Sequence, residues 1–345
     1  MKKIICYAVI LVLSIHAIFA GGTDDKKSAA QGPAGKLMIY TSIPREIADE
    51  ISLELKGLYP DCGIEFFCAS ADAIRARIAR EQASRKLDCD MVIAADPSYA
   101  IELKGRNMLY AYKSKEASSL AVAGDRDGYW YPVSLSNMVL VFNPANFSRR
   151  TIPETFYDFA FSDLAGGVAA MENPLESGTA MAALTALRDL YGYEYFDALG
   201  KQILKTDSTP EALAKLESGE YKVVMVPEEA VLKKREQELA RLAVIFPDDG
   251  TIVIPTVIMT INDRWSANRN TKAAGIITDW FLSADGQNYI VGGWMHPARA
   301  RFPKLPHDSI PTTQILERSL PINWDVYYRQ RGEIRSKYEE SVGKR

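Results

Sequence analysis

The chain has 345 residues, of which 47% are hydrophobic and 25% are charged, and its formal net charge is −3. That length is enough for two domains of ordinary size with a normal buried core, and the composition excludes disordered and fibrous classes. Lysines and arginines are scattered among acidic residues and form no basic stripe, which argues against a nucleic-acid partner.

The N-terminus reads MKKIICYAVILVLSIHAIFAGG: two lysines, an apolar run over residues 4–20 and a small-residue junction. This order is typical of a secretory signal peptide, so we expect residues 1–20 to be removed and the protein to be periplasmic. A membrane anchor is the alternative, because the run is near the roughly 17-residue lower limit for a span. Residues 21–35 are polar and small and are expected to form a disordered leader.

Three cysteines, Cys62, Cys68 and Cys89, remain in the exported chain. Their odd number leaves at least one free thiol, and their spacing matches no zinc pattern. We interpret them as small core residues, with one disulfide and a spare thiol as the alternative.

The folded body is expected to begin near Lys36 with a repeated unit of strand, tight turn and amphipathic helix. Residues 36–41 form the first predicted strand, and a helix with apolar residues at helical spacing follows the capping sequence Ser42-Ile43-Pro44. Strands over 63–68 and 90–95 open two further units. Such alternation predicts a parallel sheet covered by helices on both faces.

Two long extended stretches, 129–143 and 251–262, enclose a second alternating set. That set has predicted strands at 167–171, 222–226 and 243–246 and predicted helices from about 179, over 210–216 and over 228–242. We therefore predict two α/β lobes joined by two extended crossings, with a ligand cleft between them. Lobe 1 comprises 36–139 and 261–345, including C-terminal helices that pin the end of the chain onto the body, and lobe 2 comprises 140–260.

Short polar side chains follow the predicted strands, where an open α/β sheet binds its ligands. These loops are Thr41-Ser42, Ser70, Asp96 to Ser98, Ser177-Gly178-Thr179, Asp207-Ser208-Thr209 and Glu228-Glu229. Helix capping explains each of them alone, but their joint occurrence indicates a binding site. In the segment MENPLESGTAMAAL (171–184), a serine, a glycine and a threonine precede an Ala/Leu-rich helix, so backbone amides and two hydroxyls can surround an anion.

Catalytic patterns are not found in the sequence. HExxH, GxSxG and CxxC are absent, and no lysine follows Gly178-Thr179 as a P-loop requires. A Ser–His–Asp arrangement using His296 is the open alternative. Glu228 and Glu229 resemble a glycosidase pair, but neighbouring helical residues point to different faces, so we expect only one of them to face the cleft. We therefore predict a binding protein without a cofactor, and not an enzyme.

Several segments together resemble one family. They are KLMIYTSIP, DMVIAADPS, GYWYPVSLSNMVLVFNP, ENPLESGTAMAAL, LESGEYKVVMVPEE, GTIVIPTVIMTIND and DWFLSADGQNYI. In order and spacing the chain, from Lys36 to about Tyr338, is similar to the family-1 extracellular solute-binding proteins of ABC importers, in the branch that binds ferric iron, phosphorylated sugars, phosphonates or thiamine.

The resemblance implies the type II periplasmic-binding-protein fold, hinge closure on a small-molecule solute, delivery to the importer's permease, and a monomer. It also implies ligand contacts. The implied contacts are Ser42, Ser70, Ser136, Ser177, Gly178, Thr179, Asp207, Ser208 and Glu228 or Glu229.

One departure from the family concerns the ligand. Ferric binders of this branch supply two adjacent tyrosines from the stretch that here reads VVMVPEEAVLKKREQ, which has none; the one adjacent pair, Tyr327-Tyr328, lies in the tail. We therefore expect a small organic anion, such as a sugar phosphate or a phosphonate. Ferric iron is the alternative within the family, and an exported hydrolase or transferase on the same fold is the alternative of another class.

Overall fold

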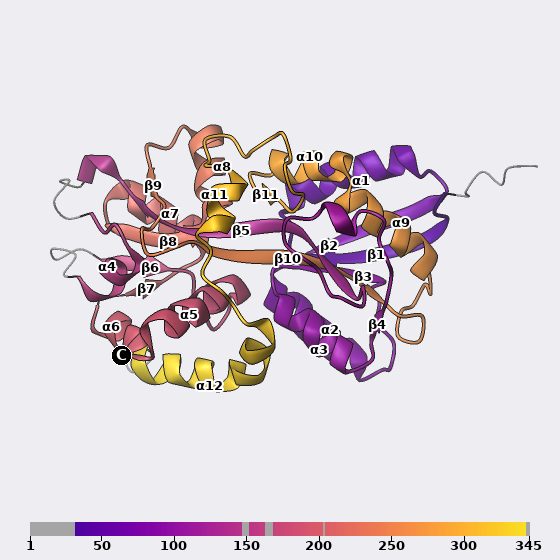
Figure 1. Cartoon of the computed structure of the whole chain (residues 1–345), viewed down its shortest axis with the longest axis horizontal. Helices are drawn as coiled ribbons and strands as arrows, with labels where there is room; N and C mark the ends of the chain where they lie inside the picture. Colours follow the sequence, from indigo (N-terminus) through magenta and orange to yellow (C-terminus); the bar gives the residue numbers. More distant parts are fainter. Residues whose placement is uncertain (1–31, 147–151, 163–167, 203, 343–345) are drawn as a thin grey trace, which may run out of the picture. The chain divides into compact units, whose positions relative to one another are not determined.

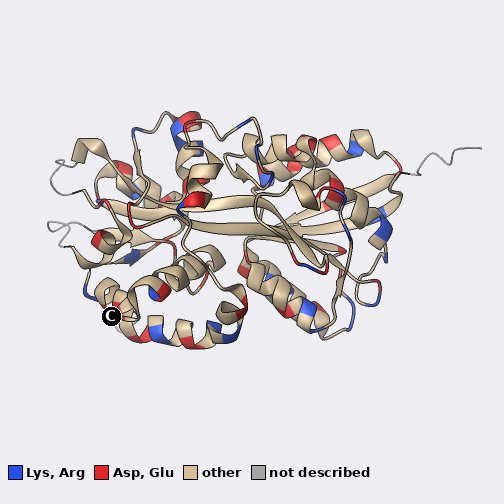
Figure 2. Ribbon diagram, viewed as in Figure 1, with Lys and Arg blue, Asp and Glu red and all other residues tan. Residues whose placement is uncertain are grey.

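The computed structural model describes residues 32–146, 152–162, 168–202 and 204–342. The predicted signal peptide and most of the predicted leader lie outside these residues. Within the described residues, no helix is both long and apolar enough to cross a membrane. Figure 2 shows basic and acidic residues interspersed along the described helices.

The fold is built on one mixed sheet with the strand order β2-β1-β3-β10-β5-β8-β6-β7 (Figure 1). Its main strands are β1 (Gly35–Thr41), β2 (Cys62–Cys68), β3 (Met91–Ala94), β5 (Trp130–Phe142), β6 (Ala169–Met171), β7 (Lys205–Thr206), β8 (Val223–Pro227) and β10 (Ile252–Ile261). The strands β1 to β3 are parallel to one another, as are β6 to β8. Short strands β4 (Leu109–Tyr110), β9 (Ala243–Ile245) and β11 (His296–Pro297) pair with β10 or β5.

The two long strands β5 and β10 join the two parallel groups. They pair antiparallel from Met138 opposite Ile252 to Trp130 opposite Met259, with one irregularity at Thr256/Val257. Every residue of β10 is buried, which explains its continuous apolar sequence. We call β1 to β3 with their helices the first half and β6 to β8 with theirs the second half.

Helices cover both faces of each half, as the alternation predicted (Figure 1). The first half carries α1 (Arg45–Leu58), α2 (Ala71–Gln82), α3 (Pro97–Gly105), α9 (Thr271–Leu282) and α10 (Ala284–Gly292). The second half carries α4 (Phe156–Phe161), α5 (Gly178–Tyr191), α6 (Glu194–Lys201), α7 (Thr209–Ser218) and α8 (Glu228–Glu238), and α11 (Thr312–Glu317) and α12 (Trp324–Val342) follow near the C-terminus. The predicted α/β class is confirmed.

Some helix boundaries follow local sequence signals and others do not. Gly219 ends α7 in the left-handed conformation, at φ 84°, as a C-terminal glycine should. The helix predicted over 228–242 is shorter than expected, because Leu239 adopts φ 57° and ends α8 after Glu238. A leucine rarely takes this conformation, so the sequence carries no signal for the early end.

The last helix, α12, contacts both halves. Its buried side chains Tyr327, Ile334 and Tyr338 belong to the apolar cluster of α5 and α6 in the second half. On the same helix, Arg331 forms ion pairs with Asp72 at 2.9 Å and Asp96 at 3.4 Å in the first half. The apolar side chains of α12 therefore belong to the second half, while the helix also lies against α3 of the first half, where Arg331 forms its ion pairs.

The three cysteines of the described chain are free thiols. Cys62 and Cys89 are buried and Cys68 is half-buried, in agreement with the interpretation as small core residues. Desolvation by burial raises the pKa of all three thiols, which keeps them in the less reactive protonated form.

The packing of α12 predicts the effect of shortening Ile334, which is fully buried. Ile334→Ala should lower the free energy of unfolding by about 2–5 kcal/mol, because it removes buried methyl groups and leaves a cavity. Urea unfolding followed by circular dichroism measures this loss. Ser336→Ala, at an exposed position of the same helix, is the control and should change stability by less than about 0.5 kcal/mol. Equal stability of the two variants would contradict the placement of α12.

Candidate ligand-binding site

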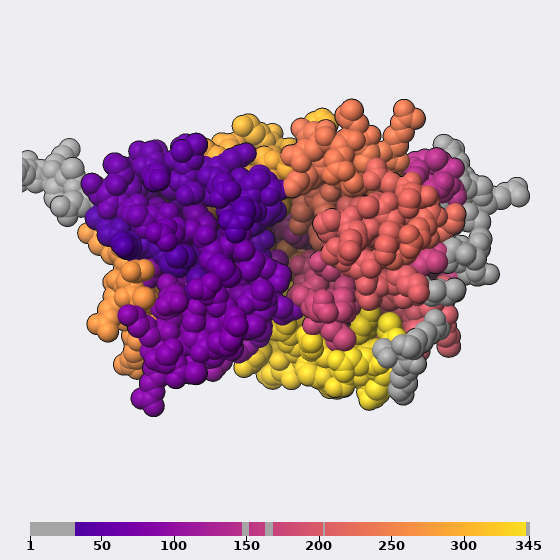
Figure 3. Space-filling model, turned by 180° about the vertical axis from the view of Figure 1, so that it is seen from behind, coloured from indigo at the N-terminus to yellow at the C-terminus, as the bar shows by residue number. Residues whose placement is uncertain are grey.

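The candidate site lies where the strands of the two halves end. Figure 3 shows the surface hollowed between the indigo and purple residues of the first half and the pink and salmon residues of the second. A central cavity of about 200 Å³ lies between loops that follow β1, β2 and β3 on one side and β6 and β8 on the other. This position is the usual one for ligand sites in open α/β sheets.

Seven of the ten predicted contact residues line this central cavity. They are Ser42, Ser70, Ser136, Ser177, Gly178, Thr179 and Glu229. The sequence argument missed Glu172 and Glu176, which line the same cavity from the loop between β6 and α5. Both glutamates lie in the segment MENPLESGT, close to the predicted serine, glycine and threonine, and this closeness is the signal that could have found them.

Two cavity serines also cap helices. Ser70 Oγ accepts a hydrogen bond from the Ala73 N–H at 3.2 Å, and Ser177 Oγ accepts one from the Ala180 N–H at 3.2 Å. These caps fix the start of α2 and α5 at the cavity wall. Capping and lining are therefore compatible roles, and two helix N-termini with their positive dipole ends border one cavity.

The two halves approach each other closely at Gly178. A Cβ atom at this position would lie 3.9 Å from the Cβ atoms of Ala71 and Asp96, which is ordinary van der Waals contact. The N-terminus of α5 thus meets the N-termini of α2 and α3 directly beside the cavity.

Two carboxylates of the cavity are held by serines. Glu172 accepts a hydrogen bond from Ser177 Oγ at 2.6 Å, and Glu229 accepts one from Ser136 Oγ at 2.6 Å. Desolvation raises the pKa of Glu172, although the Ser177 hydrogen bond opposes the shift. Desolvation likewise raises the pKa of Glu229 to about 7, opposed by its hydrogen bonds to Ser136 and the backbone. Near neutral pH, Glu229 can therefore either accept or donate a hydrogen bond.

Asp207 and Ser208 lie in a neighbouring cavity of about 460 Å³, which shares Ser70, Glu172, Glu176 and Ser177 with the central one. Asp207 accepts hydrogen bonds from the Tyr221 hydroxyl and, at 2.9 Å, from Lys215 Nζ. These two donors lower the pKa of Asp207 and hold it ionised. Ser208 forms a capping box with Glu211 at the start of α7.

Glu228 lines none of these cavities. It is fully buried and accepts hydrogen bonds from Asn137 Nδ2 at 3.0 Å and from the Ser309 hydroxyl, and lies 3.1 Å from His296 Nε2. Its neighbour Glu229 points to the central cavity instead, since a step of one residue turns the side chain to another face of the helix. Of the two glutamates between which the sequence did not decide, Glu229 lines the central cavity and Glu228 does not.

The open alternative of a catalytic triad finds no support in this cluster. Ser309 and Glu228 both face Nε2 of His296, at 3.2 and 3.1 Å, whereas Nδ1 faces the Thr312 hydroxyl at 3.0 Å. A triad needs the nucleophile and the carboxylate on opposite ring nitrogens. His296 is also only 2% exposed, which leaves a substrate no access.

The chemistry of the central cavity is that of hydroxyls, backbone amides and carboxyls. Among the residues that the structure describes, none of its lining residues is Lys, Arg, His or Tyr. The described part of the chain also contains no group of three or more His, Cys, Asp or Glu arranged to hold a metal ion.

Residues 89–328 match the family model described as bacterial extracellular solute-binding protein. No curated protein matches the chain in sequence. Similar solved structures include iron-bound HitA from Pseudomonas aeruginosa (TM-score 0.77, 14% identity), AfuA from Actinobacillus pleuropneumoniae with fructose-6-phosphate (0.76, 18%) and a periplasmic thiamin binding protein (0.73, 16%). Each covers 90% of this chain and 99% of its own length. These likenesses confirm the predicted type II periplasmic-binding-protein fold.

The raised pKa of Glu229 predicts a pH dependence of stability. Between its usual value of 4.5 and the value of about 7, the folded chain keeps a proton that the unfolded chain releases, so the free energy of unfolding falls as pH rises through this window. Glu229→Gln should remove this fall and exceed the parent in stability by up to about 3 kcal/mol at pH 8, with little difference at pH 4.

Urea unfolding at pH values from 4 to 8 measures the difference. Glu176→Gln, an exposed carboxyl at the same cavity, is the matched control and should leave the pH profile unchanged. A Glu229→Gln profile parallel to that of the parent would rule out the buried, protonatable state of Glu229.

Proposed function

We propose, from the premise that the chain belongs to the bacterial extracellular solute-binding protein family, that it is the periplasmic receptor of an ABC importer for a small organic anion. Members of this family are binding proteins and not enzymes, as the sequence predicted. The receptor binds one solute per monomer in the central cavity and delivers it to the importer's permease.

The convergence of α2 and α5 on one cavity is the observation that supports an organic anion as the ligand. Both helices begin at a capping serine that lines the cavity, and Ser42 and Thr179 add two hydroxyls. Helix N-termini present free N–H groups and positive dipole ends, which stabilise an oxyanion without a lysine or an arginine. A phosphate or phosphonate group fits this arrangement.

The carboxyls of the site fit the rest of such a solute. Glu229 accepts hydrogen bonds from solute hydroxyls when ionised, and Asp207 does so from the neighbouring cavity. When protonated, Glu172 and Glu229 donate to an oxyanion oxygen and do not repel it. A hydroxyl-bearing phosphate of the sugar phosphate type therefore suits the site better than inorganic phosphate.

We prefer the organic anion to ferric iron because hard Fe(III) requires several anionic oxygen ligands, typically tyrosinate and carboxylate. In the described residues, the central cavity offers carboxyls but no tyrosine. The similarity to the structure of iron-bound HitA supports a shared fold and not a shared ligand, because the sequence identity is only 14%.

Solute uptake into the cavity requires the two halves to move apart and close again, and we propose that β5 and β10 provide the hinge. A ligand that touches both halves stabilises the closed arrangement, because it binds that arrangement more tightly than the open one. The moving lobes would be 36–139 with most of 261–345, and 140–260 with α12.

Thr179→Val tests the proposal, because it removes only a hydroxyl and keeps the branched shape of the side chain. Sugar phosphates and phosphonates should raise the melting temperature of the parent protein, and Thr179→Val should weaken the best binder about 10- to 100-fold, the effect of one hydrogen bond to a charged group. Isothermal titration calorimetry measures the affinities.

Ser218→Ala, an exposed serine at the end of α7, is the control and should bind like the parent. Stabilisation by ferric salts alone, with no response to any phosphate or phosphonate, would overturn the organic anion.

A further inference from the structure

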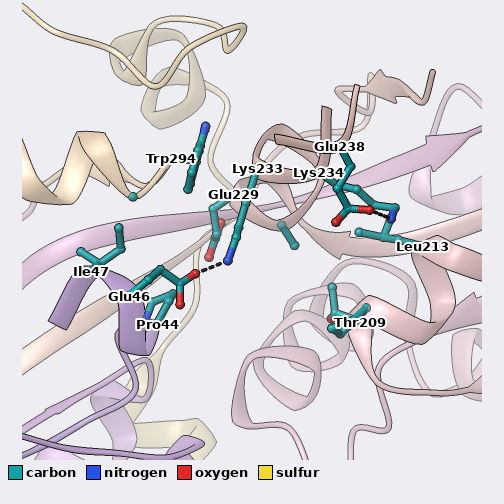
Figure 4. A pocket seen from close by; sticks show the side chains of 13 residues that line it. Pro44, Glu46, Ile47, Thr209, Leu213, Glu229, Lys233, Lys234, Glu238 and Trp294 are labelled. Carbon is teal, nitrogen blue, oxygen red and sulfur yellow. Dashed lines mark hydrogen bonds and ion pairs between the residues drawn. The ribbon is translucent and has the colours of Figure 1, made fainter. Parts of the chain in front are cut away.

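The central cavity continues into a second, larger one. The two share Pro44 and Glu229, and the second has a volume of about 420 Å³, twice that of the central cavity (Figure 4). Figure 4 shows Glu229 and Lys233 between Ile47 and Trp294 on one side and Leu213 and Thr209 on the other. We call this space the outer cavity.

The uncharged walls of the outer cavity are mainly apolar and come from both halves. Ile47 and Trp294 line it from the first half, and Leu213 and Ala230 from α7 and α8 in the second. Small-molecule sites combine such apolar and aromatic walls with a few polar groups that fix the orientation of the ligand. Here the polar groups lie in the central cavity, directly beyond Glu229.

The charged side chains of the outer cavity neutralise one another. Lys233 forms an ion pair with Glu46, and Lys234 forms ion pairs with Glu238 and, at 2.9 Å, with Glu217. Each lysine therefore already has a carboxylate partner. The lysines of the outer cavity therefore offer no unpaired charge to attract a charged ligand group, whereas the helix N-termini at the central cavity favour an anion.

Trp294 is held in place at the rim of the outer cavity. Its backbone adopts φ 60°, a left-handed conformation that is strained for a bulky residue and is often found at functional sites. Its indole Nε1 donates a hydrogen bond to Glu236 Oε2 at 2.6 Å, which ties the ring to α8. The half-buried ring keeps part of its surface exposed beside Ile47.

We infer that the solute carries a flat aromatic or heteroaromatic ring besides its oxyanion, and that this ring lies in the outer cavity against Trp294 while the oxyanion lies at α2 and α5. This inference rests on the proposed function and narrows its ligand class to ring-bearing organic phosphates or phosphonates. Continuity of the two cavities through Glu229 lets one molecule occupy both. Aromatic pairs prefer offset-stacked or edge-to-face contacts, so Trp294 selects for the ring.

Benzyl phosphate and ethyl phosphate test the inference, since they share the charged group and differ in the ring. Benzyl phosphate should bind the full protein about tenfold more tightly than ethyl phosphate, the effect expected of one aromatic contact. Trp294→Ala should abolish this preference and leave ethyl phosphate affinity within about twofold, whereas Trp294→Phe, which keeps a ring, should retain most of the preference. Isothermal titration calorimetry provides all values.

Leu213→Ala gives an independent variant on the opposite wall, where the backbone is helical and unstrained. It should weaken benzyl phosphate binding about threefold to tenfold and leave ethyl phosphate unchanged. Leu190→Ala, at an exposed leucine, is its matched control and should change neither affinity.

Equal affinities for the two phosphates, unchanged by Trp294→Ala and Leu213→Ala, would overturn the inference that the solute carries an aromatic ring. The proposed function as an anion receptor would stand. Failure of ethyl phosphate, benzyl phosphate and every sugar phosphate and phosphonate tested to bind at all would instead overturn the proposed anion itself, and the inference with it.

Discussion

The pairing of β5 with β10 is the interaction on which the other features of the structure depend. These strands are buried, so breaking their shared hydrogen bonds would leave backbone groups unpaired away from water. They run from the first half into the second, and the parallel strands of each half are added to them on either side. The loops at the strand ends are thereby brought to opposite walls of one cavity, although Ser42 and Glu172, for example, lie 130 residues apart in the chain.

Electrostatic complementarity at the site comes from the backbone and not from basic side chains. The N-termini of α2 and α5 carry partial positive charge, and the chain itself places Glu172 beside one of them. Protein carboxyls and the proposed oxyanion would therefore compete for the same positive field. The raised pKa values of Glu172 and Glu229 ease this competition, because a carboxyl that takes up a proton gives up its negative charge.

The sequence predicts many of the elements because they are encoded locally, as in the caps at Ser70 and Ser177 and the terminating glycine at Gly219. It predicts the serines of the site because the carboxyl ends of parallel strands meet at one sheet edge. It does not predict that α12 contacts both halves, because apolar burial is non-directional and an amphipathic helix can pack on more than one apolar surface. It also cannot separate Glu228 from Glu229, because His296 and Ser309, which bury Glu228, come from a distant part of the chain. The outer cavity likewise needs Trp294, whose approach to α8 has no local signal.

Arg331 has a consequence for any motion of the two halves. It is carried by a helix whose apolar side chains belong to the second half, yet its guanidinium is largely buried between Asp72 and Asp96 of the first. Separation of the halves would break the ion pairs of Arg331 with Asp72 and Asp96. Otherwise it would break the apolar contacts of α12 with the second half. A buried charge that loses its partners is costly, and salt screens such a pair far less than a surface pair. In the proposed opening of the two halves, the C-terminal helix therefore adds an energetic cost that ionic strength changes little.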